Sequence, residues 1–435
     1  MAMTATFENT LAFARSADME DPLRALRDEF IFPEKDGKPI IYFTGNSLGL
    51  QPKSAAAFIK QELDDWARYG VEGHHKAKRA WYPYHEFFSD SLGRLVGAKP
   101  SEVVAMNGLT VNVHLMLVSF YRPAGKRTKI LCEQRPFPSD RYAMASQIEF
   151  HGLDPNVDLV EMKPRAGEHI LHTEDIVQKI QELGEELALV HFGGVNFLTG
   201  QAFDMKSITE SGHRAGARVG FDLAHAAGNL VMHLHDWNVD FATWCGYKYL
   251  NSGPGAVAGA FVHERHHTND LPRFAGWWGH NKEERFNMDP VFKPIPTVEA
   301  WQLSNAPVFP MAIHRAALDL FDRAGMPALR AKSEQLTGFL KLMLNEISVE
   351  HGGLFQIITP SEPTQRGCQL SLLVRDGGRK IFDALIARGV LVDWREPNPG
   401  SEAGAGVLRL APVPLYNSFE DVYRFGEVLN DCVRT

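Results

Sequence analysis

The sequence lacks several features that would place the protein in a membrane or on nucleic acid. No stretch reaches the roughly 18 uninterrupted apolar residues that span a bilayer, and the first residues show no basic segment followed by an apolar one. No run of lysine or arginine forms a stripe that could follow a phosphate backbone, and the formal net charge is -8. We therefore expect neither a membrane protein nor a nucleic-acid-binding protein.

Cysteine is also scarce. The four cysteines, Cys132, Cys245, Cys368 and Cys432, are scattered without CxxC spacing. This pattern predicts thiols in a reducing compartment, so we expect a cytoplasmic protein. Internal repeats and low-complexity segments are missing too, which argues against a repeat or fibrous architecture.

The composition is that of a folded protein with more than one domain. Of the 435 residues, 44% are hydrophobic and 23% are charged, which is near the average for soluble globular proteins. A chain of this length is too long for one ordinary core. We predict a large domain over residues 55–300 and a smaller domain formed by residues 1–54 and 301–435.

The large domain is predicted to be α/β. Short apolar runs alternate with helix-length segments, and the runs are 103–106, 129–132, 187–192, 218–223, 239–244 and 257–262. Strands that are apolar throughout are typical of a mainly parallel sheet with helices on both faces. Ligands of such sheets bind beyond the carboxyl ends of the strands, so we expect a site there.

The residues after 300 have a different pattern. The segment "NAPVFPMAIHRAALDLFDRAG" predicts a long helix, whereas "RGCQLSLLV", "GVLVDWREP" and "GVLRLAPVPLYN" predict strands of an α+β domain. Two proline-rich passages, 289–297 and 395–406, predict loops or connections.

Lys248 is a candidate catalytic residue. It follows an apolar run and lies in the Gly-rich segment "WCGYKYLNSGPG", whereas most lysines are solvated surface charges. A lysine attacks a carbonyl group only after losing its proton, so catalytic lysines usually lie where the pKa of the amine is lowered.

Asp222 is a second candidate, because it lies near the end of the apolar run "RVGFDL". A carboxylate there needs a cationic or hydrogen-bonded partner. The protonated ring nitrogen of pyridoxal phosphate (PLP) would be such a partner, with Lys248 bound to the aldehyde carbon. A helix-capping aspartate and an unrelated lysine would explain the two residues equally well.

Two turns could complete such a site. Gly108, Leu109 and Thr110 lie between a predicted strand and a predicted helix, where free backbone N–H groups and a hydroxyl could bind a phosphate. In "RPFPSDRYAM", Phe137 could stack on a flat ring, and Asp140 could cap a helix or face the site. Ordinary helix caps and a core aromatic remain the alternative interpretation.

Together these segments resemble kynureninase, a family of PLP-dependent enzymes with the aspartate-aminotransferase fold (fold type I, class V aminotransferase-like). The resemblance covers nearly the whole chain, through "YFTGNSLGLQP", "VEGHHKAKRAW", "NGLT", "FPSD", "VNFLTGQ", "DLAHAAGN", "WCGYKYLNSGPG", "GWWGH", "LSNAP", "RGCQLS" and "LRLAPVPLYNSF". It implies hydrolysis of the Cβ–Cγ bond of L-kynurenine to anthranilate and L-alanine, in tryptophan degradation or NAD biosynthesis.

The resemblance also implies roles for residues around the cofactor. Lys248 would carry it, Asp222 would face the ring nitrogen, His225 would lie near the phenolic oxygen, and Tyr247 would touch the phosphate and assist proton transfer. The other implied contacts are Leu109, Thr110, Phe137 and Asp140, together with Trp278 and Asn305 from a second subunit. A homodimer with a shared active site follows.

Arg409 in "LRLAPVP" matches the arginine that binds the α-carboxylate of the substrate, a task that suits its bidentate fork. His74 and the pair Ser304 and Asn305 resemble residues of family members that accept 3-hydroxy-L-kynurenine, and Ser47 is expected at the substrate as well. We therefore expect activity on both substrates.

One departure from the family concerns the residues before "VNFLTGQ". Several family members have Ser or Thr before "GV", whereas this chain has Gly193 and Gly194. The role of Gly193 and Gly194 at this point is therefore left open by the sequence.

Rival interpretations have less support. A cysteine desulfurase or aminotransferase on the same scaffold is the nearest alternative, but a desulfurase needs a nucleophilic cysteine in a mobile loop, and Cys368 is predicted to lie in a strand. Cys245 is predicted to be a buried structural residue. A cofactor-free binding protein would not need Asp222, Lys248 and Arg409 together.

Histidine-rich segments could suggest a metal site. The segments are "HLH" (233–235) and "HERHH" (263–267), and neither has a matching acidic or cysteine cluster in the sequence. We predict no catalytic metal.

Overall fold

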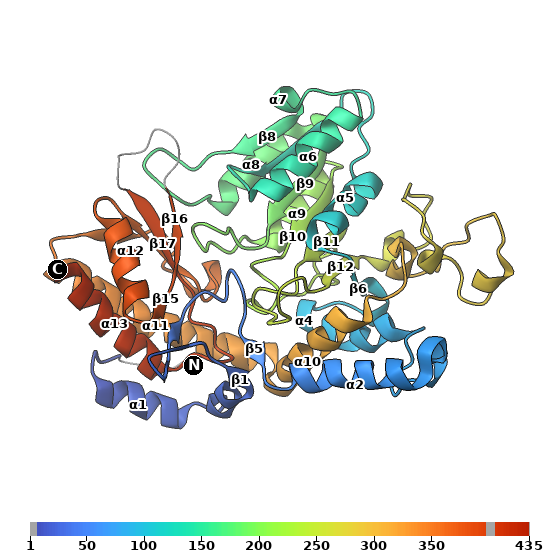
Figure 1. Ribbon diagram of the computed structural model, residues 1–435. Helices are drawn as coiled ribbons and strands as arrows, with labels where there is room; N and C mark the ends of the chain where they lie inside the picture. The colour runs from blue at the N-terminus through green and yellow to red at the C-terminus, as the bar shows by residue number, and fades with distance from the viewer. Residues whose placement is uncertain (1–6, 397–404, 435) are drawn as a thin grey trace.

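A seven-stranded sheet forms the centre of the larger part of the chain (Figure 1). In the computed structural model, which describes residues 7–396 and 405–434, the strand order is β6-β12-β11-β10-β9-β7-β8. The strands are β6 (Val103–Met106), β7 (Lys129–Glu133), β8 (Leu159–Met162), β9 (Leu187–Gly193), β10 (Arg218–Asp222), β11 (Phe241–Trp244) and β12 (Ala258–Val262). β12 is antiparallel to both neighbours, whereas β7 to β11 pair in parallel, which confirms a mainly parallel sheet.

The six strands expected from the sequence are all present, and β8 is the one that was missed. β8 is an edge strand, and three of its four residues are half-buried. Its segment "LVEM" contains Glu161, so it lacks the continuous apolar character on which the other strands were recognised.

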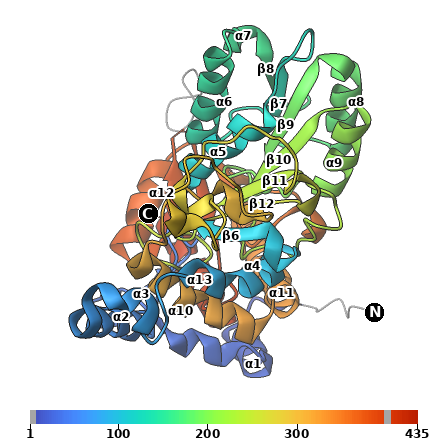
Figure 2. The same cartoon turned by 90° about the vertical axis from the view of Figure 1, so that its right-hand side faces the viewer.

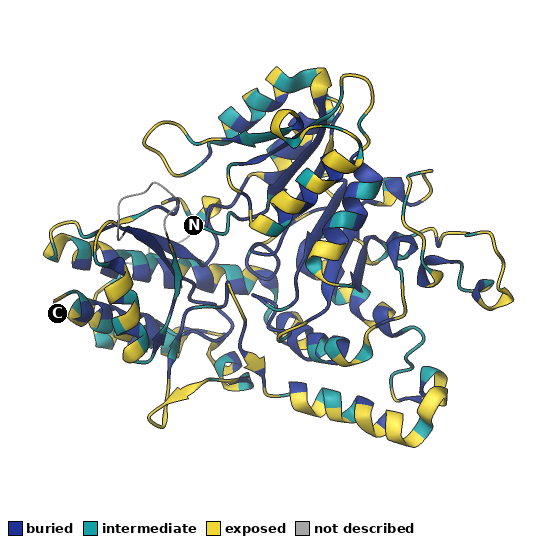
Figure 3. Ribbon diagram, turned by 45° about the horizontal axis from the view of Figure 1, so that its top comes forward, coloured by how far each residue is buried: buried dark blue, intermediate teal, exposed yellow. Residues whose placement is uncertain are grey.

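Helices cover both faces of this sheet. Figure 2 shows α5 (Leu109–Phe120) and α6 (Pro138–Phe150) on one side, and α8 (Thr173–Leu183) and α9 (Met205–Arg214) on the other. A separate hydrophobic cluster lies on each face. The strands are therefore buried on both sides, as Figure 3 shows, which explains why their sequences are apolar without alternation.

A second, antiparallel sheet has the order β13-β14-β17-β16. Its strands are β13 (Phe355–Ile357), β14 (Leu370–Val374), β16 (Asp393–Arg395) and β17 (Gly406–Leu410). Side chains from four helices share a hydrophobic cluster with these strands, and the helices are α1 (Leu11–Glu20), α11 (Met326–Glu350), α12 (Gly378–Ala387) and α13 (Phe419–Arg434).

Several expectations for this region need correction. "GVLVDWREP" forms two strands, because β15 (Val390–Leu391) pairs with β4 (Ile41–Tyr42) and β16 pairs with β17. β17 ends at Leu410, since Pro412 and Pro414 have no N–H to continue the ladder. Cys368 lies in a bend before β14 and not in a strand.

Two proline-rich passages, 289–297 and 395–406, were expected to be loops. Residues 289–297 contain no helix or strand element, as expected. Of the second loop, 395–406, residues 397–404 lie outside the described part of the chain.

The N-terminal segment joins the second sheet and then reaches the first. After the parallel pair of β4 and β15, Thr44 bridges Ala411, and the Gly49 N–H donates to the Tyr247 carbonyl at 2.8 Å. α1 (Leu11–Glu20) packs against α13. The other short strands of this segment are β1 (Phe30–Ile31), β2 (Glu34–Lys35), β3 (Lys38–Pro39) and β5 (Gln51–Pro52).

The predicted long helix is α10 (Val308–Ala324), and it packs against α2 (Ala55–Tyr69) and α4 (Ser89–Val96). Two further short helices are α3 (Gly73–Lys76) and α7 (Pro155–Asp158). The domain boundaries at 55–300 stay a prediction. Within the described ranges, no helix has the length and apolar character needed to cross a bilayer.

A buried ion pair ties the N-terminal segment to α11, and we predict that it matters for stability. Lys332 Nζ lies 2.7 Å from Asp21 Oδ2, and both side chains are buried. Lys332→Met would leave the carboxylate buried without its cation, so we expect a loss of about 3 kcal/mol in the free energy of unfolding. Urea denaturation measures this loss.

The matched control is Lys126→Met, which breaks the solvent-exposed ion pair with Glu185. No measurable loss is expected there, because exposed pairs are screened by water and salt. Equal losses in the two variants would contradict a special role for the buried pair.

Candidate active site

A cavity of about 340 Å³ lies at the carboxyl ends of β7, β9 and β10, where Glu133, Gly193 and Asp222 end their strands and line it. It is the position expected for a ligand of a parallel sheet. Eight of the residues expected at the cofactor line this cavity: Leu109, Thr110, Phe137, Asp140, Asp222, His225, Tyr247 and Lys248.

Lys248 lies at the centre of this group. Its Nζ is 3.2 Å from His225 Nε2 and 5.4 Å from the centroid of the Phe137 ring. Burial lowers the pKa of His225 well below its ordinary value, and the positive charge of Lys248 lowers it further, so the imidazole is neutral. A neutral ring accepts a hydrogen bond from the amine and holds it in place.

Three carboxyl groups share the cavity with the amine. Burial raises the pKa of Asp222, and the charge of the nearby Lys248 partly offsets this rise. Asp222 Oδ1 also accepts a hydrogen bond from the Ala224 N–H at 2.6 Å. Burial and then the charge of Asp222 raise the pKa of Asp140 well above its ordinary value. Burial also raises the pKa of Glu133 to about 7. A cation next to Asp222 would offset the free-energy cost of keeping its buried carboxylate charged.

Two helices begin at the cavity wall. α5 begins at Leu109 after Gly108, and within the described residues no side chain caps its first N–H groups. α6 begins at Pro138, directly after Phe137. The free N–H groups and the positive end of the dipole of α5, with the Thr110 hydroxyl, provide a site for an anion such as a phosphate.

The residues present fit PLP. An amine for the aldehyde, an acid for the ring nitrogen, an aromatic ring to stack on and a helix N-terminus for the phosphate all line one cavity. His225 Nδ1 is buried and, in the part of the chain that the structure describes, has no hydrogen-bond partner. It can therefore meet a polar group of a bound cofactor.

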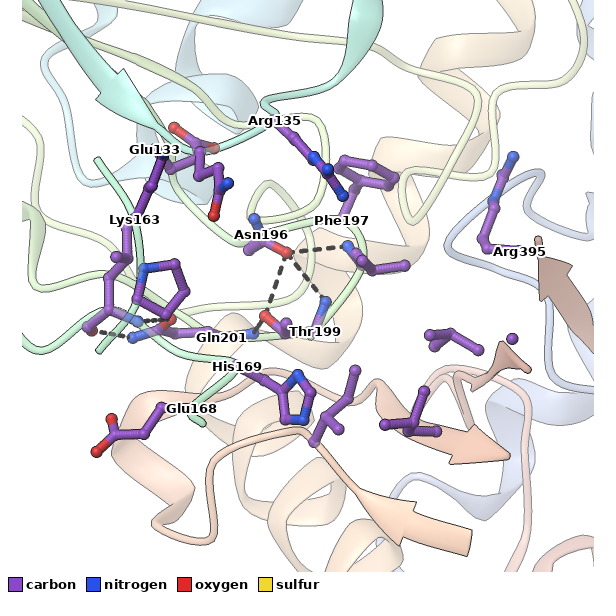
Figure 4. Close-up of a pocket in the computed structure, with 18 of the residues that line it drawn as sticks. Glu133, Arg135, Lys163, Glu168, His169, Asn196, Phe197, Thr199, Gln201 and Arg395 are labelled. Carbon is purple, nitrogen blue, oxygen red and sulfur yellow. Dashed lines mark hydrogen bonds between the residues drawn. The ribbon is translucent and has the colours of Figure 1, made fainter. Parts of the chain in front are cut away.

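Arg409 lies beside this cavity but comes from the second sheet. Its Nη1 donates to the Phe197 carbonyl at 2.7 Å, and its Nε donates to Asp393 Oδ1 at 2.9 Å. Phe197 lines the 340 Å³ cavity and also a larger one of about 830 Å³ between the two sheets. Figure 4 shows Phe197 in that larger cavity, next to Asn196, which accepts three hydrogen bonds from Leu198 and Thr199.

The other expected site residues do not line the 340 Å³ cavity. Ser47 is exposed and lies two residues before Gly49, whose N–H donates to the Tyr247 carbonyl. His74 lies in α3, and its Nδ1 is 2.9 Å from the Val71 carbonyl oxygen. Ser304 and Asn305 are exposed, whereas Trp278 is buried under the guanidinium of Arg285.

Sequence reasoning missed Glu133 and Phe197. Glu133 ends an apolar strand just as Asp222 does, so the same signal could have identified it. The Gly193 N–H donates to both Glu133 oxygens at 3.1 and 3.2 Å. A Cβ on Gly193 would lie 3.0 Å from Glu133 Oε1, so Glu133 occupies the space that a side chain at 193 would need.

Two histidines of the histidine-rich segments do lie together with an acid. Ligand atoms of Glu102, His235 and His263 lie within 4.8 Å of one another. The Glu102 oxygens, however, already accept the Lys99 N–H, the Glu264 N–H and His235 Nδ1 at 2.8 to 3.1 Å. Hydrogen bonds within the chain therefore account for the arrangement.

The cysteines are buried and form no disulfide, and all four belong to the described residues. Burial raises the pKa of Cys245, and it raises the pKa of Cys368 to about 12. A thiol with such a pKa stays protonated near neutral pH, so Cys368 is not a ready nucleophile.

The fold and the cavity define a class of proteins. A model of the class-V aminotransferase family matches residues 41–353. Among solved structures, a cystine C–S lyase with glycine linked to its PLP cofactor has a TM-score of 0.73 at 17% identity, covering 90% of this chain and 96% of the other. The chain therefore has the class-V aminotransferase fold.

More similar relatives narrow the class. A model of the kynureninase C-terminal domain matches residues 329–429. Kynureninases of Flavobacterium psychrophilum and Myxococcus xanthus are each 55% identical, covering 97% and 98% of this chain and 98% of each relative. The chain belongs to the kynureninase family, which confirms the resemblance in its sequence.

The raised pKa of Glu133 predicts how the cofactor-free protein responds to pH. Its pKa is about 7 in the folded protein, against about 4.3 in an unfolded chain. A raised pKa of an acid stabilises the folded protein at low pH, and this stabilisation is lost as pH rises towards 7. We expect Glu133→Gln, which still accepts the Gly193 N–H, to gain up to about 3 kcal/mol relative to the native protein between pH 4 and pH 8.

Urea denaturation at several pH values measures this difference. Glu185→Gln is the control, since that carboxyl is exposed and should show no such gain. A constant difference between Glu133→Gln and the native protein across the range would contradict the prediction.

Proposed function

We propose that the protein is a PLP-dependent kynureninase, which hydrolyses the Cβ–Cγ bond of L-kynurenine and also accepts 3-hydroxy-L-kynurenine. The observation that carries the proposal is one cavity in which Lys248, Asp222 and His225 meet two helix N-termini beside Arg409. Membership of the family supports it. Such an activity would belong to tryptophan degradation or NAD biosynthesis, in the cytoplasm.

The products define the bond changes. The hydroxyl of water goes to the γ-carbonyl carbon and forms the carboxyl group of anthranilate, or of 3-hydroxyanthranilate, while a hydrogen ends on the β-carbon of L-alanine. PLP supplies an electron sink next to the α-carbon when it is bound. The residues of the chain must therefore bind the amino acid, orient it and move protons.

The proposed proton carriers are Lys248 and Tyr247. Lys248 Nζ is the group that takes the proton from the α-carbon, and the neutral His225 keeps this nitrogen in position. Burial, with a smaller effect of Cys245, raises the pKa of Tyr247, so its hydroxyl remains a donor. With PLP bound, the Asp222 carboxylate would hold a proton on the ring nitrogen of the cofactor, since burial makes an unpaired charge there costly.

Arg409 is proposed to bind the α-carboxylate. Its guanidinium is buried and always charged, and it donates a hydrogen bond to the carbonyl of Phe197, which lines the cavity. For the aryl group, we propose contacts with His74, Ser304, Asn305 and Ser47, of which His74 and Asn305 could bond a ring hydroxyl.

A cysteine desulfurase or aminotransferase on the same scaffold is less well supported. The buried Cys368, with its raised pKa, is a poor nucleophile. The kynureninase relatives at 55% identity also favour the hydrolase.

We further propose a homodimer in which residues near Trp278 and Asn305 enter the site of the other subunit. The segment that carries them extends from the body of the molecule at the right of Figure 1. Trp277 is 47% exposed and Trp278 only 3%, so Trp277 is the more accessible of the two indoles. Its exposed hydrophobic neighbours on this segment, Phe274, Phe286, Met288 and Val291, support an interface there.

The activity is tested with purified, PLP-loaded protein. We expect equal amounts of anthranilate and alanine from L-kynurenine, and of 3-hydroxyanthranilate and alanine from 3-hydroxy-L-kynurenine. Lys248→Ala removes the amine that moves the proton, so we expect kcat to fall by at least about 1,000-fold. Chromatography of the aromatic amine and of alanine measures both results.

The exposed Lys206 provides the control, because Lys206→Ala removes a similar charge from a residue that does not line the cavity. It should leave kcat unchanged. Sulfur release or amino-group exchange without these products would contradict the proposed reaction, and full turnover by Lys248→Ala would exclude its role.

The shared site is tested by mixing two inactive subunits. Lys248→Ala and Asn305→Ala each damage every site of their own homodimers. A mixed dimer has one site with Lys248 from one chain and Asn305 from the other, so co-expression should restore up to about a quarter of native activity. Activity no higher than that of the two variants alone would mean that each site takes both residues from one chain.

A further inference from the structure

Arg409 is held on one side by a carboxylate of the adjacent strand. Asp393 in β16 lies directly opposite Arg409 in the antiparallel pair of β16 and β17. Asp393 Oδ1 lies 2.9 Å from Arg409 Nε and 2.8 Å from its Nη2. One oxygen thus binds the side of the guanidinium, and Arg409 itself is 1% exposed.

A backbone carbonyl holds the other side. Arg409 Nη1 donates to the Phe197 carbonyl, 2.7 Å away, in the loop between β9 and α9. The Phe197 ring packs edge-on against the Phe137 ring, with 5.3 Å between centroids. The arginine is therefore fixed between the second sheet and the wall of the cofactor cavity.

These contacts leave a particular part of the guanidinium available. An arginine has five N–H donors; the Nε donor bonds Asp393 and one donor on Nη1 bonds the Phe197 carbonyl, while Nη2 lies 2.8 Å from Asp393 Oδ1 in an ion pair. At least one donor remains on each terminal nitrogen. N–H donors on the two terminal nitrogens can pair with the two oxygens of a carboxylate.

Arg409 is linked to the proposed reaction centre through Phe197. Burial lowers the pKa of His225 most, followed by the charge of Lys248 and then the charge of Arg409. Phe197 lines the same cavity as Lys248.

We propose that Asp393 is a positioning residue, which turns the free end of Arg409 towards the α-carboxylate of the bound amino acid. This inference deepens the proposed function and rests on it for the role of Arg409. Asp393 acts through the arginine and touches no reacting atom.

A purely electrostatic role for Asp393 makes the opposite prediction. Asp393 also pairs with Arg395, whose Nε is 3.0 Å from Oδ1 and whose Nη2 is 3.2 Å from Asp393. Removal of the negative charge would leave two arginines near the site and would attract a carboxylate more strongly. If positioning dominates, loss of the Asp393 oxygen that binds Arg409 must weaken binding of the substrate carboxylate, even though the site becomes more positive.

The test uses PLP-loaded protein and two ligands, L-alanine and L-alaninamide, which lacks the carboxylate. Binding is followed by the change in the visible absorption of the cofactor. For Asp393→Ala we expect L-alanine to bind about 10 to 100-fold more weakly, with L-alaninamide within about 3-fold of native. Asp393→Asn keeps an oxygen acceptor for Nε and Nη2, so we expect near-native binding of both ligands.

Three results would overturn the proposal: equal losses for the two ligands in Asp393→Ala, tighter binding of L-alanine to it, or no change in either ligand. Asp393→Leu, of similar size and without an acceptor, replaces Asp393→Ala if that variant does not fold. Since the readout is binding of L-alanine, a native protein that binds it but cleaves no kynurenine would refute the proposed function and leave this inference intact.

Discussion

The burial of ionisable groups in one small cavity is the constraint on which the site depends. Lys248, Asp222, Asp140 and Glu133 share about 340 Å³ at the ends of three strands. Water cannot solvate them fully there, so each group must find its partner within the cavity or change its protonation state. The neutral His225 and the raised pKa values of the acids are consequences of this confinement.

The fold creates this confinement from two sheets with different tasks. The large sheet supplies the acids at the ends of β7 and β10, and its helices supply free N–H groups at the same edge. The second sheet supplies Arg409, which reaches the cavity by its bond to Phe197. The loop around Phe197 thus connects the Arg409 guanidinium with the Phe137 ring, which lines the cavity.

Much of this arrangement could be predicted from the sequence, since the relevant signals are local. Apolar runs revealed six strands of the large sheet, and the positions of Asp222 and Lys248 after such runs suggested the site. Contacts between distant segments left no such signal: Phe197 and Arg409 are 212 positions apart. β8 was missed because an edge strand need not be apolar. His74, Ser304 and Asn305 follow from the family resemblance, and a single chain does not bring them to the cavity.

The path of the N-terminal segment has a consequence for biosynthesis. Ile41 in β4 pairs with Val390 and Thr44 bridges Ala411, so this part of the chain needs partners that the ribosome makes nearly 350 residues later. At about 5 to 20 residues per second, this interval lasts tens of seconds. Until then, the backbone groups of β4 and Thr44 lack these partners and are open to other contacts.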